Sequence, residues 1–395
     1  MTSQIKYNCI FGGGGIRGMC YVGAIKALKE LKIEIGAIAG SSVGAVFASL
    51  LAVGYNEEEI KELFLDFNFN MFRDLNINLF NTDISLSKGE IFLDWLREKI
   101  GKKVLGKKYI NQKIRFKDIE KDLHILTLDI NTNTPYIFSK ENTPDEEIAL
   151  AVRSSASLPG LMKPINLGDS MLVDGDLMKS WPAWEIYEEL NTSKARLLEF
   201  RLEGSKEDRE IKNPMAYLNS IISTIWFLCT ENIFNTNFAN DRYDYIVIDT
   251  KETIIWDFTL DNKEKEKLVD KGYKSTKDYF LKSLPQKKNI ILKTYKRIYE
   301  QTKLLSDIIN KNIAEEAKNV LNEILSTMYE DSKYIDISIY EKLKDLKECL
   351  VLNTKKKFMF TKIDNEKQIR ERVEFITMLI EERITDITNY LKSFS

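Results

Sequence analysis

The five residues Gly40 to Gly44 read G-x-S-x-G, with Ser42 at the centre. This spacing is typical of a sharp turn between a strand and a helix that exposes a serine hydroxyl for attack on a carbonyl carbon. Small neighbours let the backbone bend and a substrate approach. A helix that starts just after Ser42 would point its first N–H groups at an anion formed there. Small residues also pack tight strand–helix turns, so the pentapeptide alone fits a nucleophile and a structural turn equally well.

A second candidate for chemistry is the glycine run Gly12 to Gly15, which is followed by Ile16-Arg17-Gly18. Adjacent glycines expose backbone N–H groups and allow backbone angles that other residues avoid. Such a loop can bind an anion. The anion would be a phosphate or the oxyanion of a tetrahedral intermediate.

The segment from Gly13 to Gly18 also matches the G-x-G-x-x-G pattern of dinucleotide sites. That site needs an acidic residue about 20 positions further on to bind ribose. Ala39, Gly40 and Ser41 occupy this place, which disfavours a dinucleotide site. A non-catalytic module that binds a nucleotide or a lipid through the glycine loop remains the alternative function.

A third candidate is Asp174, which follows the apolar run 171–173 and precedes Gly175 and Asp176. A carboxylate at the end of a strand can reach a neighbouring site. Asp174 is therefore a candidate to accept the Ser42 proton, and partial burial would make an aspartate a better base by raising its pKa. An ordinary Asp-Gly turn explains the same residues equally well.

The single histidine of the chain, His124, lies within the apolar segment 123–129, which has the pattern of a buried strand. This setting favours a structural histidine over a catalytic one. A Ser-His-Asp triad needs an imidazole. If Ser42 is a nucleophile, we therefore expect a group other than histidine to take its proton.

Composition narrows the class of protein. The 395 residues are 44% hydrophobic and 30% charged, as in a globular protein with a substantial core, and the net charge of −2 gives no reason to expect nucleic acid as a partner. The four cysteines form no C-x-x-C pair, which indicates reduced thiols in a cytosol-like compartment and no zinc site. Residues 1–8 lack the pattern of a signal peptide, and the uncharged stretch 35–55 is interpreted as a buried strand and helix because glycines and serines interrupt it.

The elements that must position these residues alternate between strands and helices. This order favours a parallel sheet covered by helices. Strands are expected at 7–11, 35–39, 123–130, 136–139, 171–173, 196–202 and 245–249. Helices are expected at 19–31, 45–53 and 57–66 and from Pro144 to Val152. Another helix is expected after Ser87, which would be its cap, with Ile91 on its apolar side.

The composition changes near residue 286. Beyond it glycine and proline disappear, and Lys, Glu, Ile and Leu dominate. Apolar residues spaced by three and four from Ile369 to Leu391 predict one long amphipathic helix. We therefore expect two parts, 1–285 and an all-helical region of about four helices at 286–395.

The three motifs in this order resemble the patatin-like phospholipase family. The resemblance covers about residues 5–285 and extends to the stretch from Arg153 to Gly160 and to Gly272-Tyr273. It implies an α/β fold, a three-layer sandwich with a mostly parallel central sheet. It also implies a serine–aspartate dyad that hydrolyses lipid acyl esters without a metal or another cofactor.

Carried over by position, the resemblance makes Ser42 the nucleophile and Asp174 the base. It makes the glycine loop the oxyanion hole and leaves Arg17 either to support that loop or to bind a lipid phosphate. The loop residues concerned are Gly13, Gly14, Gly15 and Gly18.

One residue departs from the family pattern, because Asp176 stands where glycine or alanine is usual. Two carboxylates two residues apart repel each other, which would raise the pKa of one of them. We expect Asp176 either to tune Asp174 in this way or to face solvent.

The sequence thus predicts a metal-independent lipid acyl hydrolase of the phospholipase A type, a serine carboxylic-ester hydrolase. Its expected substrate is a phospholipid membrane surface, and it would be cytoplasmic and peripheral to the membrane when active. No nucleic acid partner is expected. Residues 286–395 would regulate the protein, form a homo-oligomer, bind a small-molecule activator, or only pack on one another.

Overall fold

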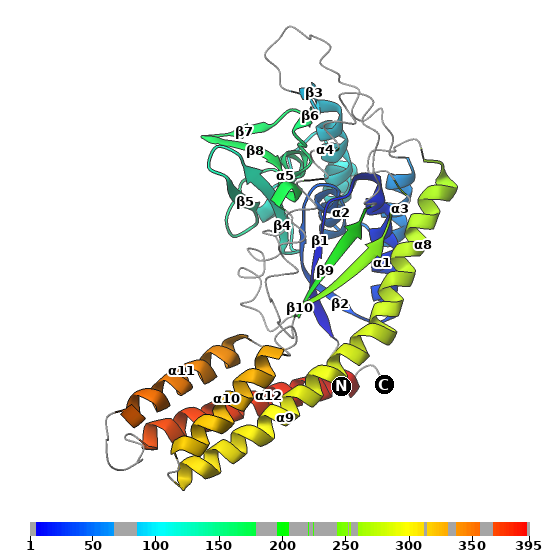
Figure 1. The fold of residues 1–395 in the computed structure, drawn as a ribbon. Helices are drawn as coiled ribbons and strands as arrows, with labels where there is room; N and C mark the ends of the chain where they lie inside the picture. The colour runs from blue at the N-terminus through cyan, green and yellow to red at the C-terminus, as the bar shows by residue number, and fades with distance from the viewer. Residues whose placement is uncertain are drawn as a thin grey trace. The chain divides into compact units, whose positions relative to one another are not determined.

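The computed structural model divides the chain into two compact units, each described by itself (Figure 1). The first holds the described residues up to Asp278 except Tyr243, and the second holds Tyr243 and those from Tyr279 onward. The described residues are 5–66, 85–178, 196–204, 220, 224, 243–251, 253, 260–311, 314–330, 337–355 and 366–392. The boundary between the two units, at 278/279, lies before the compositional change at 286. Helical residues continue through this stretch, so no loop marks the boundary.

The first unit is built on a sheet with the strand order β10-β9-β1-β2-β4-β8-β7. The strands β9, β1, β2 and β4 are parallel, whereas β5 and β8 pair with β4, and β7 with β8, in antiparallel fashion. This arrangement confirms the predicted α/β fold with a mostly parallel central sheet. The bounds are β1 Lys6–Phe11, β2 Glu34–Gly40, β4 Leu123–Asp129, β5 Thr134–Phe138, β7 Ile165–Leu167, β8 Ser170–Asp174, β9 Arg196–Glu203 and β10 Tyr243–Asp249, with β3 Ser85–Ser87 and β6 Gly160–Met162 paired separately.

Helices cover this sheet. α2 contacts β1, β2 and β4, α5 contacts β4 and β8, and α1 packs on α8 and α3 (Figure 1). α1 and α8 approach closely, since a Cβ atom at Gly272 would overlap the Cys20 carbonyl group. Asn56 caps α3 through a capping box with Glu59. The bounds are α1 Met19–Glu30, α2 Val43–Ala52, α3 Glu57–Leu65, α4 Glu90–Leu105, α5 Ile148–Ser155 and α8 Asn262–Asp278.

The predicted start of α4 was wrong. Its N-cap is Gly89 at a φ of 74°, and Ser87 belongs to β3, from where its Oγ accepts a hydrogen bond from the Gly89 N–H at 3.1 Å. Ile91 is 44% exposed, whereas Phe92 and Leu96 are buried. The buried face of the helix therefore includes Phe92 in place of Ile91.

The predicted start of α5 was also wrong. Pro144 lies in a turn before the helix, which begins at Ile148. The carbonyl groups of Pro144 and Glu146 accept hydrogen bonds from Lys117 and Phe116. A tertiary contact with the preceding segment thus replaces the helical hydrogen bonds that Pro144 at a first turn would favour.

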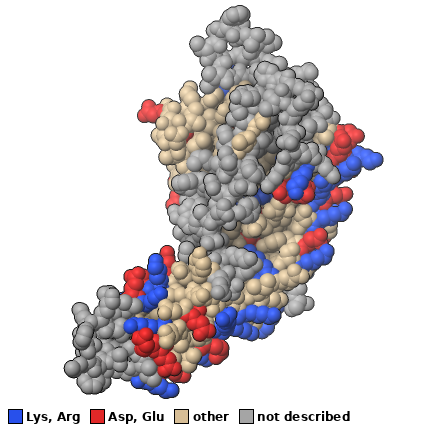
Figure 2. Space-filling view, viewed as in Figure 1, with Lys and Arg blue, Asp and Glu red and all other residues tan. Residues whose placement is uncertain are grey.

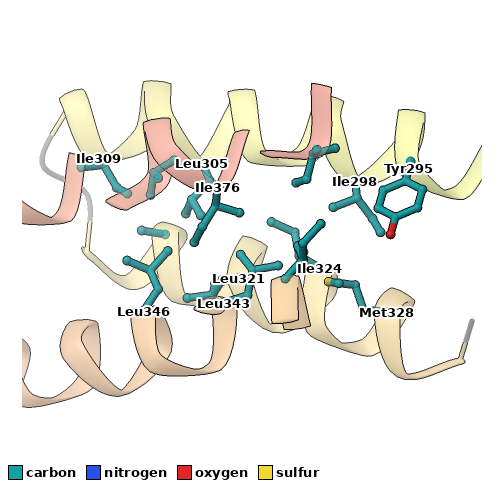
Figure 3. Packing of buried hydrophobic residues seen from close by; sticks show 14 of the residues in the cluster. Tyr295, Ile298, Leu305, Ile309, Leu321, Ile324, Met328, Leu343, Leu346 and Ile376 are labelled. Carbon is teal, nitrogen blue, oxygen red and sulfur yellow. The ribbon is translucent and has the colours of Figure 1, made fainter. Parts of the chain in front are cut away.

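The second unit contains four long α-helices within its described residues, which confirms the predicted C-terminal helical region. They are α9 Leu284–Asn310, α10 Ala314–Glu330, α11 Ile337–Lys355 and α12 Glu366–Lys392. Their apolar faces form one core, in which Leu305, Leu321, Leu343 and Ile376 meet (Figure 3). This unit therefore buries its own hydrophobic core.

Charged side chains of both signs lie next to each other on the described parts of the face shown in Figure 2, which agrees with the net charge of −2. Among the described helices, none is both long and apolar enough to cross a membrane. The described residues also contain no group of three or more His, Cys, Asp or Glu side chains placed to hold a metal ion.

Candidate active site

The G-x-S-x-G segment forms a sharp turn between β2 and α2. Ser42 has a φ of 52° and a ψ of −127°, a backbone conformation that costs free energy in any residue except glycine. A Cβ atom at Gly40 would overlap the backbone of Gly44, and a Cβ atom at Gly44 would overlap the carbonyl group of Phe11. Close backbone contact therefore requires both glycines and holds Ser42 at the tip of the turn.

Ser155 of α5 supports this turn. Its Oγ accepts a hydrogen bond from the Ser42 N–H at 3.0 Å and donates one to the Leu126 carbonyl oxygen in β4. The elbow is thereby tied to the sheet through one hydroxyl group. Serines at the end of a helix carry no sequence signal of such a tertiary contact, so the role of Ser155 could not be predicted.

Asp174 is the last residue of β8, where it pairs with Thr127 of β4. Its side chain is buried, and its Oδ1 accepts a hydrogen bond from the Asp176 N–H at 2.8 Å. A Cβ atom at Gly175 would overlap the Leu126 carbonyl oxygen. The same carbonyl oxygen thus contacts Gly175, which is next to Asp174, and the Ser155 hydroxyl group that holds the Ser42 backbone.

A buried arginine organises the segment beneath Asp174. Arg153 donates hydrogen bonds to the Gly89 carbonyl oxygen at 3.1 Å, the Lys163 carbonyl oxygen at 2.9 Å and the Ser157 Oγ. The Ser157 carbonyl oxygen in turn accepts a hydrogen bond from the Asp174 N–H at 3.0 Å. Arg153 therefore holds the strand end that carries Asp174.

The glycine loop lies beside the elbow because β1 and β2 are parallel and Phe11 pairs with Gly40. The Ser41 N–H donates to the Phe11 carbonyl oxygen at 3.1 Å, which fixes the two strand ends together. Tyr21 donates a hydrogen bond to the Gly12 carbonyl oxygen at 2.6 Å. Burial, followed by the negative charge of Asp176, raises the pKa of Tyr21 well above its usual value, so this phenol stays protonated and keeps its donor role.

The four predicted oxyanion-hole residues have different surroundings. The Gly13 N–H donates to Asp176 Oδ1 at 2.9 Å, so in this structure it already has an acceptor. Gly14 and Gly15 have positive φ values of 154° and 57° and lead into a short 3-10 helix, whose first N–H groups have no acceptor inside the helix. A Cβ atom at Gly18 would overlap the Val43 side chain, so Gly18 permits close packing of the loop against α2.

Arg17 is 3% exposed, and its Nε donates a hydrogen bond to the Thr253 carbonyl oxygen at 2.8 Å. Its guanidinium group also lies against Gly204 at the end of β9. Of the two roles expected for Arg17, this position matches support of the loop. To bind a lipid phosphate, the side chain would have to leave these contacts.

Asp176 does not face solvent, which corrects one of the two alternatives predicted for it. Its side chain is 2% exposed, and its Oδ1 accepts hydrogen bonds from the Gly13 N–H and, at 3.1 Å, from the Ser41 Oγ. No local pattern links Asp176 to residues so far away in the chain, so neither contact could be predicted from the sequence. Ser41 consequently joins the site as a residue that the sequence did not single out.

His124 is buried in β4 and its Nε2 lies 2.9 Å from Asp122 Oδ1. This contact with His124 is the main cause that lowers the pKa of Asp122. The pairing gives the imidazole a structural partner, in line with the structural role predicted for it.

Fold and site together define an α/β protein in which a serine elbow, a glycine loop and a buried aspartate meet at one end of the central strands. The family model for patatin-like phospholipases matches residues 9–186. The chain belongs to the patatin-like phospholipase family, a family of lipid hydrolases.

Relatives and a solved structure agree with this assignment. The chain is 30% identical over 288 residues to the uncharacterized protein R571 of Acanthamoeba polyphaga mimivirus. The matched region covers 71% of this chain and 95% of that protein. It is 27% identical over 177 residues to the probable lipid hydrolase 463L of Invertebrate iridescent virus 6, covering 44% and 60% of the two chains. The crystal structure of VipD from Legionella pneumophila has a similar fold, with a TM-score of 0.51, 15% identity and coverage of 98% of this chain and 90% of that one.

Proposed function

We propose that the protein hydrolyses fatty-acyl esters of membrane phospholipids through a dyad of Ser42 and Asp174, as a phospholipase of the A type. The observation that carries this proposal is that two groups contact the same Leu126 carbonyl oxygen: the Ser155 hydroxyl that holds the strained Ser42 turn, and Gly175 next to the buried Asp174. Membership of the patatin-like phospholipase family and similarity to a probable lipid hydrolase support the choice of substrate.

In the first step, Asp174 accepts the proton of Ser42 as Oγ attacks the ester carbonyl carbon. The N–H groups of Gly14 and Gly15 stabilise the negative oxygen of the tetrahedral intermediate, aided by the first N–H groups of α2. The intermediate collapses to an acyl-enzyme, and the lysophospholipid leaves as an alcohol that takes the proton from Asp174.

In the second step, a water molecule attacks the acyl carbonyl carbon and Asp174 accepts a proton from it. The second tetrahedral intermediate releases the fatty acid, and the proton returns to Ser42 Oγ. Base, nucleophile and oxyanion donors all come from the chain in this scheme. We therefore expect turnover to persist in excess chelator.

The proposed substrate requires the protein to meet a phospholipid surface, so we propose a cytoplasmic protein that binds membranes peripherally when active. Roles of residues 286–395 in homo-oligomerisation or in binding a small-molecule activator remain predictions. Flotation of the full chain with phospholipid vesicles would test the first proposal. Sedimentation velocity of the full chain would test self-association.

The decisive experiment combines turnover with labelling. The full chain is incubated with phosphatidylcholine vesicles, and free fatty acid and lysophospholipid are measured by mass spectrometry. A parallel sample is treated with a fluorophosphonate, and the modified residue is mapped by peptide mass spectrometry. We expect both products and a modified Ser42. Vesicle binding without products and without labelling would instead support a non-catalytic lipid-binding module.

Ser155→Ala tests the support of the elbow. The substitution removes the acceptor of the Ser42 N–H and leaves a half-buried donor unpaired, where a fully buried donor would cost about 1–3 kcal/mol. If about 1.4 kcal/mol of this penalty is added to the activation free energy, kcat falls about tenfold. The measurement is the initial rate of fatty-acid release at saturating vesicles.

The matched control is Ser154→Ala. Ser154 is the adjacent buried serine, but its Oγ donates to the Leu150 carbonyl oxygen within α5. We expect this variant to keep the wild-type rate. Equal losses in the two variants would show that the effect comes from α5 in general and would contradict the role of Ser155.

A further inference from the structure

We propose that Asp176 is a positioning residue that joins the glycine loop, the serine elbow and the Asp174 strand end into one rigid site. The inference rests on the proposed function, because its main readout is the rate of that reaction. It also makes a structural prediction that can be read without turnover.

The hydrogen bonds of Asp176 reach all three motifs. Its Oδ1 accepts from the Gly13 N–H at 2.9 Å and from the Ser41 Oγ at 3.1 Å, and its own N–H donates to Asp174 Oδ1 at 2.8 Å. Gly13 belongs to the loop, Ser41 precedes the nucleophile, and Asp174 is the proposed base. One residue thus contacts the parts of the site that the chain separates most widely.

The fit between Asp176 and the loop is close. A Cβ atom at Gly13 would lie 2.5 Å from Asp176 Cγ, so Asp176 and a larger residue at position 13 exclude each other. The other oxygen, Oδ2, is buried and has no hydrogen-bond partner among the described residues. Buried carboxyl oxygens without a hydrogen-bond partner are rare in folded proteins, since moving such an oxygen out of water is unfavourable. Here the reason is the pair of donors that Oδ1 gathers from two separate motifs.

The side chain and the backbone of Asp176 have separate effects. The backbone N–H orients Asp174 and would survive a change of side chain. The side chain accepts from the Gly13 N–H and so fixes the loop next to Gly14 and Gly15, whose N–H groups are the proposed oxyanion donors. Its second donor, Ser41, is the neighbour of the nucleophile. Substitution of the side chain should therefore lower kcat more than it changes KM.

The test compares Asp176→Ala with Asp176→Asn in the full chain. Alanine removes the acceptor, whereas asparagine keeps a carbonyl oxygen at the Oδ1 position, loses the charge and replaces Oδ2 by an NH2 group. We expect Asp176→Ala to lower kcat about 10- to 100-fold with little change in KM, less than the loss from removing an oxyanion donor itself. Asp176→Asn should stay within about threefold of wild type, because the amide oxygen can still accept both hydrogen bonds.

Two further variants sharpen the comparison. Asp169→Ala removes an exposed carboxylate from the turn before β8 and should leave kcat unchanged. Ser41→Ala removes one of the two donors to Oδ1 and should cause a smaller loss than Asp176→Ala. Because both changes act on the same hydrogen bond, Ser41→Ala combined with Asp176→Ala should be no slower than Asp176→Ala alone.

Hydrogen exchange gives a readout that needs no turnover. In wild type and Asp176→Asn, we expect the amide of Gly13 to exchange slowly, and in Asp176→Ala to exchange fast, measured by mass spectrometry on peptides that span the loop. Unchanged exchange and unchanged kcat in a folded Asp176→Ala protein would overturn the proposal, as would an Asn variant as slow as the Ala variant. If Asp176→Ala does not fold, Ser41→Ala and Asp176→Asn decide. A wild-type protein without turnover would refute the proposed function. The hydrogen exchange of the Gly13 amide would still test whether Asp176 positions the loop.

Discussion

Replacement of Ser42 by alanine is expected to abolish phospholipid hydrolysis, with kcat/KM lowered by about 10⁴-fold or more. The reason is that no acyl-enzyme can form without the Oγ nucleophile, and only the loop and the bound water would remain to accelerate the reaction. Fatty-acid release from phosphatidylcholine vesicles measures the loss. Fluorophosphonate labelling should disappear in the same variant.

A second substitution separates chemistry from folding. Ser42 has a φ of 52°, which glycine adopts at little cost, so Ser42→Gly should be inactive yet melt at or above the wild-type temperature. Ser49→Ala is the matched control, because Ser49 is buried in α2 and its Oγ contacts only the Val46 carbonyl oxygen among the hydrogen bonds of the described residues. It should remain active. Retained hydrolysis in Ser42→Ala would place the nucleophile elsewhere.

Local patterns were enough to predict the parts of the site that lie next to each other in the chain. The first strand, the glycine loop, the second strand, the elbow and α2 follow one another within residues 6–52, so their order and glycine spacing predict the turns directly. The helix predicted at 57–66 is equally local, since the capping box of Asn56 at its start is complete within four residues. The helical region was predictable because its apolar residues repeat with helical spacing.

Contacts between segments that lie far apart in the chain could not be predicted from the sequence. A Cβ atom at position 89 would overlap the Arg153 guanidinium group, so Gly89 caps α4, and nothing near Gly89 in the sequence indicates Arg153. The site shows the same limit. A pair of aspartates two residues apart suggested repulsion, whereas the 3-10 turn that starts at Gly175 takes the Asp176 carboxylate to Gly13. The sequence thus indicated that Asp176 is unusual, but it did not indicate which residues Asp176 contacts.

Replacement of Asp174 by asparagine is expected to lower kcat by about 10³- to 10⁴-fold while the fold stays intact. The amide is isosteric and its oxygen can still accept the hydrogen bond from the Asp176 N–H, but it cannot take a proton from Ser42 Oγ. Initial rates of fatty-acid release, with thermal melting as the check on folding, measure this loss. Asp169→Asn, at the exposed turn before β8, should keep the wild-type rate.

The dyad makes a stronger prediction than either single variant. If Ser42 and Asp174 act as one unit, the double variant Ser42→Ala/Asp174→Asn should be no slower than Ser42→Ala, because the base has no function without its nucleophile. Asp174→Asn should also slow fluorophosphonate labelling of Ser42, since that reaction needs the same proton transfer. Near-normal hydrolysis in Asp174→Asn would mean that another group accepts the proton. His124→Gln would then be the next variant to measure, because His124 is the chain's one imidazole and lies on β4, the strand that Asp174 pairs with.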